Sequence, residues 1–245
     1  MSALATRGPA LTTGVLLLAT VVAWGVILGP LRNLGMGGMQ GATMRVEIPL
    51  FMITWVVMLV AMMLPAVTPM VLTYQRITAG RGKGSVMPVA FLLGYLIVWS
   101  AAGIVPLVFN LVLPQVQMSL GMDGWARLFA FSLLTVGLYQ LSPWKAACLK
   151  SCRSPLGFFM AHDFGAGLTG AVRLGGLHGL ICVGCCWALM ALMVVAGSMS
   201  AAWMAALALV FITEKVWRRG LALSRVVGAG ALAAAVLVLV TGWTL

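Results

Sequence analysis

The chain has 245 residues, of which 62% are hydrophobic and only 8% are charged, and its mean hydropathy is +1.11. Soluble domains carry about 25% charged residues, so this composition excludes a soluble globular protein and favours an integral membrane protein. The formal net charge of +11 does not indicate a nucleic-acid partner, because the basic residues stand beside apolar segments, where they meet lipid headgroups.

Seven apolar segments are long enough to cross a bilayer, since a helix needs about 20 mostly apolar residues to span the hydrocarbon core. They cover residues 11–29, 49–73, 86–113, 125–142, 172–197, 199–216 and 223–243. We therefore predict an all-α fold, a polytopic membrane bundle of seven transmembrane helices that forms a single domain over residues 1–245. The first segment lacks a small-x-small cleavage site, so we expect a retained helix and not a signal peptide.

The basic residues divide unevenly between alternate loops. With the N-terminus in the cytoplasm, the outside segments hold only Arg32, Arg45 and Arg127. The inside segments hold Arg7, Arg76, Arg81, Lys83, Lys145, Lys150, Arg153, Arg173, Lys215, Arg218, Arg219 and Arg225. By the positive-inside rule, this distribution predicts a membrane protein with an N-in, C-out topology.

Methionine and proline mark the second segment. Trp55, Met58 and Met62 fall on one face of a helix, and Pro65 and Pro69 follow within it. Each proline leaves a carbonyl group one turn earlier without its helical donor, which is tolerated where helices pack or line a cavity. Thioether sulfurs are soft metal ligands, although methionine also serves as a flexible filler of protein cores.

Further methionines fall in the segments predicted to lie outside: Met36, Met39, Met44, Met118 and Met122. Thioethers form no disulfides and have no proton to lose, so they suit Cu(I) capture in an oxidising space, whereas thiolates survive in the reducing cytosol. We expect an order across the membrane of outer Met, core Met and Cys, and inner Cys.

Two cysteines four residues apart follow the fourth segment on the predicted cytoplasmic side. Cys148 and Cys152 lie among Lys145, Lys150 and Arg153. Nearby cations lower the pKa of a thiol and improve it as a ligand and nucleophile. We expect a metal or redox role for the pair, with two reduced cytosolic thiols as the alternative.

The fifth segment carries the densest set of soft ligands. His178, Cys182 and Cys185 lie three and four residues apart and share one face of a helix, with Cys186 at its flank. Thiolate and imidazole suit Cu(I), zinc or an iron–sulfur centre. The alternative is that these cysteines are small apolar residues packed between helices. Three cysteines and a histidine on one face favour a metal site.

Acidic residues are scarce, and the sixth segment holds one of them, Glu214, beside Lys215. We expect the two to form an ion pair at the level of the lipid headgroups, with a proton-coupling role as the alternative. No Ser/His/Asp arrangement, phosphate-binding glycine loop or carboxylate pair is recognisable, so we do not expect an enzyme.

Four motifs carry a resemblance to a known family. They are Met62-Met-Leu-Pro65-Ala-Val-Thr-Pro69-Met, Gly94-Tyr-Leu-Ile-Val-Trp99, the run from Gly137 to Pro155 with Cys148 and Cys152, and Gly179-Leu-Ile-Cys182-Val-Gly-Cys185-Cys186-Trp187-Ala-Leu-Met190. Over about residues 50–217 the chain resembles the bacterial family described as predicted metal-binding integral membrane proteins, a domain of unknown function. The resemblance implies metal binding in which the five cysteines belong together, and a location in the bacterial inner (cytoplasmic) membrane.

These features predict a membrane protein that binds a soft transition metal, copper(I) first, for transport, storage or delivery. The predicted ligands are Cys182 and Cys185 at the core, His178 and Cys186 beside them, Cys148 and Cys152 toward the cytosol, and Met58 and Met62 in the second segment. The expected partners are the lipid bilayer and a metal-donor or metal-acceptor protein. Two alternatives stay open: a membrane thiol-disulfide oxidoreductase, and an accessory subunit of a larger membrane complex.

Overall fold

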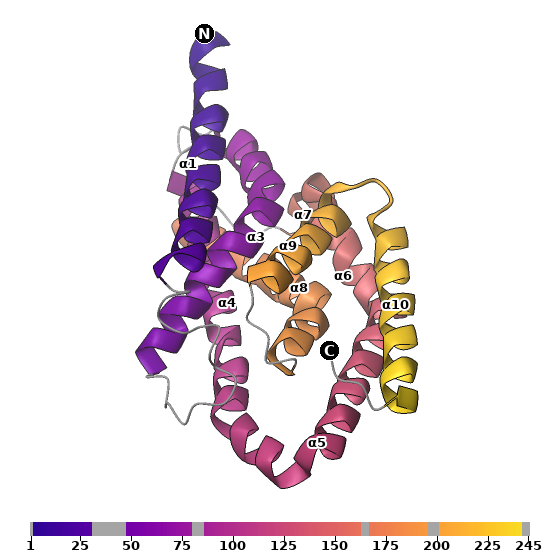
Figure 1. The fold of residues 1–245 in the computed structure, drawn as a ribbon. Helices are drawn as coiled ribbons and strands as arrows, with labels where there is room; N and C mark the ends of the chain where they lie inside the picture. The colour runs from indigo at the N-terminus through magenta and orange to yellow at the C-terminus, as the bar shows by residue number, and fades with distance from the viewer. Residues whose placement is uncertain (1, 31–47, 80–85, 163–166, 196–200, 242–245) are drawn as a thin grey trace.

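The computed structural model describes residues 2–30, 48–79, 86–162, 167–195 and 201–241, and every regular element in these ranges is a helix (Figure 1). The predicted all-α fold is therefore confirmed for the described residues. In chain order the helices are α1 (Ser2–Leu28), α3 (Ile48–Ala79), α4 (Val86–Ala102), α5 (Ile104–Leu141), α6 (Pro143–Arg153), α7 (Pro155–Ala161), α8 (Leu168–Val195), α9 (Ala201–Val216) and α10 (Gly220–Thr241).

Five segments of the described chain are long and apolar enough to cross a membrane. They are Gly8–Leu28, Ile48–Ala79, Val86–Phe109, Leu168–Val195 and Gly220–Thr241. The described parts of the other two predicted spans are also helical, but 125–141 forms the end of α5, and 201–216 forms α9, which has only 16 residues. The described structure thus supports five such helices where the sequence predicted seven.

The chain turns within α5 and not in a loop. We expected residues 114–124 to connect two spans, but they are helical except at Gly121, where φ is 64° and ψ is −174°. Glycine adopts this positive φ without a steric penalty, so one residue is enough to break the helix. Figure 1 shows the chain descending through α4 and rising again along α5. Met118 consequently lies on a helix, with its side chain exposed.

α3 continues through both of its prolines. Pro65 removes the donor for the carbonyl group of Ala61, and Trp24 of α1 supplies a replacement through Nε1 at 3.2 Å. The backbone group that the sequence predicted to be free is therefore used to join α1 to α3.

α8 packs on four other helices, α4, α5, α6 and α9. α3 packs on α1, α4 and α9. One large buried core joins Met58 and Met62 of α3 with Cys182, Cys185 and Cys186 of α8. The sulfur-rich faces of both helices thus point into the same interior.

Glycines bring α8 close to α4. A Cβ atom on Gly175 would lie 1.8 Å from the carbonyl oxygen of Phe91, and one on Gly94 would lie 2.0 Å from that of Val172. The adjacent Gly176 is less crowded, because the nearest atom to a Cβ there would be 3.7 Å away. Small residues at a helix crossing allow this approach of two backbones.

We expect Gly175→Ala to lower the free energy of unfolding by about 1–3 kcal/mol, because the added methyl group must separate two helix backbones. Gly176→Ala is the matched control and should not lower the free energy of unfolding, because alanine favours a helix over glycine by about 1 kcal/mol and the methyl group has room. Thermal unfolding of both variants in one detergent measures the difference. Equal stabilities would contradict the close packing of α4 on α8.

Candidate metal centre

The soft ligands of α8 face the interior of the bundle. Cys182, Cys185 and Cys186 are at most 1% exposed, and His178 is 3% exposed. The thiols of Cys185 and Cys186 both donate to the carbonyl oxygen of Cys182, at 3.1 and 2.8 Å. The helical spacing of these residues therefore produces the single buried stripe that the sequence predicted.

A second, shorter helix brings Cys152 to this stripe. Ser142 is the N-cap of α6, where its Oγ accepts from the backbone N–H of Lys145 at 3.2 Å, and Pro143 occupies the first helical position. Residues seven apart share a helix face, so Lys145 and Cys152 both point toward α8. Cys152 Sγ lies 3.9 Å from Cys185 Sγ as a result.

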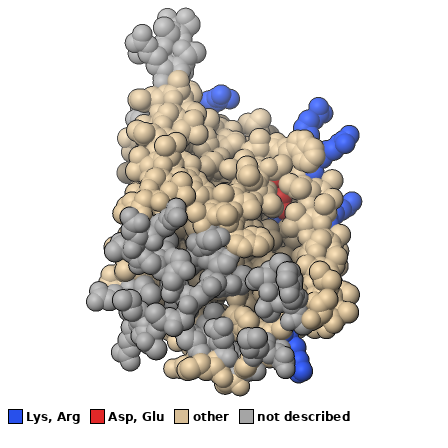
Figure 2. Space-filling view, viewed as in Figure 1, with Lys and Arg blue, Asp and Glu red and all other residues tan. Residues whose placement is uncertain are grey.

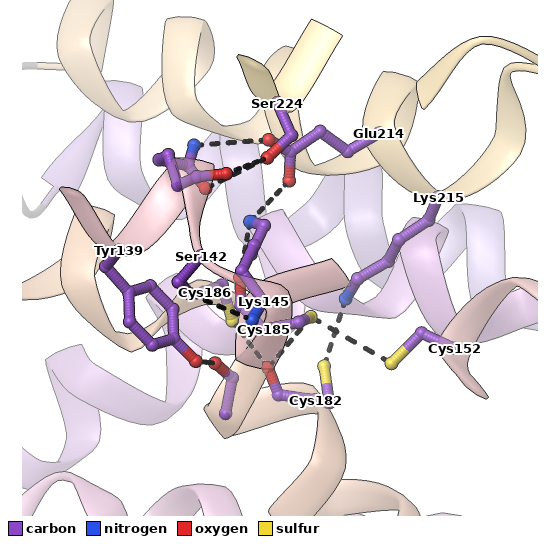
Figure 3. A network of polar contacts seen from close by, with 12 residues as sticks. Tyr139, Ser142, Lys145, Cys152, Cys182, Cys185, Cys186, Glu214, Lys215 and Ser224 are labelled. Carbon is purple, nitrogen blue, oxygen red and sulfur yellow. Dashed lines mark hydrogen bonds and ion pairs between the residues drawn. The ribbon is translucent and has the colours of Figure 1, made fainter. Parts of the chain in front are cut away.

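Three thiols from two helices meet at one point. The sulfur atoms of Cys152, Cys182 and Cys185 all lie within 4.8 Å of one another (Figure 3). Metal–thiolate bonds of about 2.3 Å place sulfurs that share one ion roughly 3.8–4.6 Å apart, a range that includes the 3.9 Å between Cys152 and Cys185. Among the described residues, no other three His, Cys, Asp or Glu side chains come together in this way. The donor set fits a soft ion such as Cu(I).

Two polar side chains contact the sulfur of Cys182. Lys215 of α9 donates from Nζ to Cys182 Sγ at 3.0 Å, and Tyr95 Oη of α4 lies 3.2 Å from the same atom. An ammonium group beside sulfur favours the thiolate form, which is the form that binds metals. Groups at this distance also hold a ligand in a fixed orientation.

The expected ion pair between Glu214 and Lys215 is wrong. Glu214 is buried, and its Oε2 pairs with Nζ of the buried Lys145 at 2.7 Å. Successive helical residues point about 100° apart, so neighbours in sequence on α9 reach different partners. Glu214 reaches α6, and Lys215 reaches α8.

The Lys145–Glu214 pair belongs to a larger buried network (Figure 3). Gln140 Nε2 donates to Glu214 Oε1 at 3.2 Å, and Ser224 Oγ donates to the backbone carbonyl oxygen of Gln140 at 3.1 Å. Lys145 also donates to the carbonyl oxygen of Cys185. The network therefore links α5, α6, α8, α9 and α10 beside the three sulfurs. Apart from the scarcity of acidic residues, nothing in the sequence indicated this network.

The pKa values of the two cysteines of α6 are raised and not lowered, contrary to the expectation from the nearby cations. Burial raises the pKa of the Cys148 thiol, Cys185 raises it further, and Lys145 only opposes this change. The sulfurs of Cys182 and then Cys185 raise the pKa of Cys152, and burial adds to the effect. The sequence showed the charges but not the desolvation, which disfavours a thiolate.

His178 lies outside the three-sulfur group, although it stands one turn before Cys182. Its ring stacks between those of Phe91 and Tyr95, with centroids 5.9 and 5.8 Å away, and the edge contact with Phe158 is 5.3 Å. Nδ1 is buried and has no hydrogen-bond partner among the described residues. The imidazole is thus held by aromatic packing, with one nitrogen free to accept a ligand.

The other predicted ligands also lie outside the group. Cys148 is half-buried on α6, with its Sγ 3.2 Å from the position of a Cβ on Gly184. Cys186 bonds to its own helix, and Met58 and Met62 are buried in the shared core. Three methionines of the predicted outer loop lie beyond the described residues: Met36, Met39 and Met44.

One known protein family matches most of the chain. A family model described as PpoB2, copper chaperone, matches residues 52–238. The match covers more than half of the chain and includes all five cysteines, so the protein belongs to this copper chaperone family. No curated protein and no solved structure matches the chain.

Proposed function

We propose that this protein is a multi-pass protein of the bacterial inner membrane that binds Cu(I) at Cys152, Cys182 and Cys185 and delivers it to an acceptor protein. The convergence of three thiols from α6 and α8, in a member of a copper chaperone family, carries the proposal. Soft thiolate sulfur selects Cu(I) over harder ions. Copper is the cargo here, so the site has both to hold the ion and to release it.

The proposed topology keeps seven crossings and the N-terminus in the cytoplasm. On the face shown in Figure 2, several Lys and Arg side chains gather at the end of the bundle that carries α7 and the α9–α10 turn. Arg218 and Arg219 of that turn are exposed. The positive-inside rule places this end in the cytoplasm. The three sulfurs then lie toward the cytoplasmic side of the membrane, next to α6 and Lys215.

Exposure within the site supports a direction of transfer. Cys182 and Cys185 are fully buried, whereas Cys152 and Cys148, one turn apart on α6, are half-buried. An incoming thiol of an acceptor reaches the half-buried cysteines of α6 before the fully buried cysteines of α8, so ligand exchange starts at Cys152 and continues through Cys148. His178, Cys186, Met58 and Met62 lie outside the three-sulfur group and are not ligands of the bound ion in this proposal.

We expect Cys152→Ser to weaken Cu(I) binding by at least ~10-fold, because a hard hydroxyl replaces one of three soft ligands. Cys148→Ser is the matched control, since it alters the same helix one turn away. It should keep the wild-type affinity and slow transfer to an acceptor. Anaerobic titration against a colorimetric Cu(I) chelator measures both affinities. A wild-type affinity in Cys152→Ser would remove this residue from the site.

A thiol-disulfide oxidoreductase is the second candidate, because the sulfurs of Cys152 and Cys185 are only 3.9 Å apart. Oxidation of this pair to a disulfide would release two electrons and two protons to an acceptor molecule. Its activity would survive a Cu(I) chelator, whereas copper delivery would stop. Counting free thiols during turnover, with and without the chelator, separates the two functions.

A further inference from the structure

One buried lysine joins the three helices that meet at the proposed copper site. Lys145 stands in the first turn of α6, and its side chain is completely buried. Its Nζ lies 2.7 Å from Glu214 Oε2 of α9 and donates to the carbonyl oxygen of Cys185 of α8 (Figure 3). A buried ammonium group is stable only with such partners, so α6, α8 and α9 are held in fixed positions at this nitrogen.

The same face of α6 carries a proposed copper ligand. Cys152 follows Lys145 by seven residues, or about two helical turns, and Leu149 between them is buried on the same face. α6 has only 11 residues, so the depth at which Lys145 is anchored also determines where Cys152 lies. Lys145 therefore fixes both partners of the 3.9 Å contact, Cys152 through α6 and Cys185 through its carbonyl group.

We propose that Lys145 is a positioning residue of the metal centre. Its pair with Glu214 holds α6 in the register that lets Cys152 complete a three-sulfur site. Without the pair, α6 shifts and a bound ion keeps only Cys182 and Cys185. The copper part of this inference rests on the proposed function, whereas the placement of Cys152 is a property of the metal-free protein and is tested separately.

α6 offers a matched control for this role. Lys150 lies on the same helix, five residues after Lys145, but its side chain is exposed. Replacing either lysine by methionine removes one positive charge and keeps a long unbranched side chain. Lys145→Met removes the buried contacts, and Lys150→Met does not. A difference between the two variants therefore reports the buried contacts and not the net charge of the helix.

The metal-free test measures how fast Cys152 and Cys185 form a disulfide. The full chain carries serine at Cys148, Cys182 and Cys186, so one thiol pair remains. The oxidant is a dipyridyl disulfide, which is reduced to two thiopyridones as the two protein thiols become one disulfide. The released thiopyridone is followed by its absorbance.

In this background we expect Lys145→Met to slow disulfide formation by at least ~10-fold, because a displacement of about 1 Å strongly reduces the rate of an intramolecular reaction. Lys150→Met should react within twofold of the parent. If Lys145→Met does not fold, Lys145→Gln with Glu214→Gln leaves no unpaired buried charge and decides the question with the same expected slowing. An unchanged rate overturns the proposal.

The copper test counts sulfur ligands by X-ray absorption in protein with all five cysteines. We expect three sulfurs around Cu(I) in the wild type and in Lys150→Met, and two in Lys145→Met. Three sulfurs in Lys145→Met would overturn the positioning role. A wild type that binds no Cu(I) would end the proposed function, and the disulfide rates would still decide whether Lys145 places Cys152.

Discussion

Replacing Cys182 and Cys185 together by serine is expected to abolish stoichiometric Cu(I) binding, with a loss of affinity above ~100-fold. The two residues supply two of the three sulfurs from a single helix, and both are fully buried. Residues that only orient a metal ligand typically contribute 10–100-fold to affinity, so removing two direct ligands has a larger effect. Elemental analysis and anaerobic chelator competition measure the loss.

Cys186→Ser is the control for that experiment. The Cys186 thiol donates to the carbonyl oxygen of Cys182, and a serine hydroxyl makes the same bond in a helix. We expect its copper content to stay within twofold of the wild type. Undiminished copper in the double variant of Cys182 and Cys185 would show that the ion is bound elsewhere.

The second large effect concerns the buried ion pair. Glu214→Leu should lower the free energy of unfolding by about 3–5 kcal/mol, because it leaves the ammonium group of Lys145 buried without its counter-charge. Lys145→Met in the same chain should recover most of the loss, since an apolar pair of similar volume carries no charge to desolvate. Chemical unfolding of the wild type, both single variants and the double variant completes the cycle.

The double-mutant cycle also shows whether Lys145 and Glu214 interact. Groups in direct contact show non-additive effects, so the double variant should be more stable than the sum of the single variants predicts. Additive losses would mean that Lys145 and Glu214 do not interact in the folded protein. The carbonyl group of Cys185 and the amide of Gln140 would then have to satisfy the two charges separately.

Local periodicity explains what could be predicted from the sequence. Long apolar segments indicated an all-α fold, and five of the seven predicted spans correspond to helices of sufficient length and apolarity. Spacings of three and four placed Cys182 and Cys185 on one buried stripe, because a helix fixes the direction of each side chain. The freed carbonyl group of Ala61 could also be predicted, since it depends only on Pro65.

Contacts between distant segments could not be predicted in this way. Glu214 stands beside Lys215 in sequence but pairs with Lys145, 69 residues away, because α6 and α9 pack together. The stretch after the fourth segment showed no apolar length that would mark a spanning helix, yet α6 carries the third sulfur, on Cys152. The reversal at Gly121 depends on a positive φ that glycine allows but does not require.

Metal content and thiol counting on one purified sample test the central claim most directly. Protein purified in detergent, reduced, and loaded with Cu(I) without oxygen should hold about one tightly bound copper ion per chain, and all five cysteines should titrate as free thiols once the copper is removed. A reduced, folded protein that retains no copper would contradict the account. Copper retained at an unchanged level after Cys152, Cys182 and Cys185 are all replaced by serine would contradict it equally.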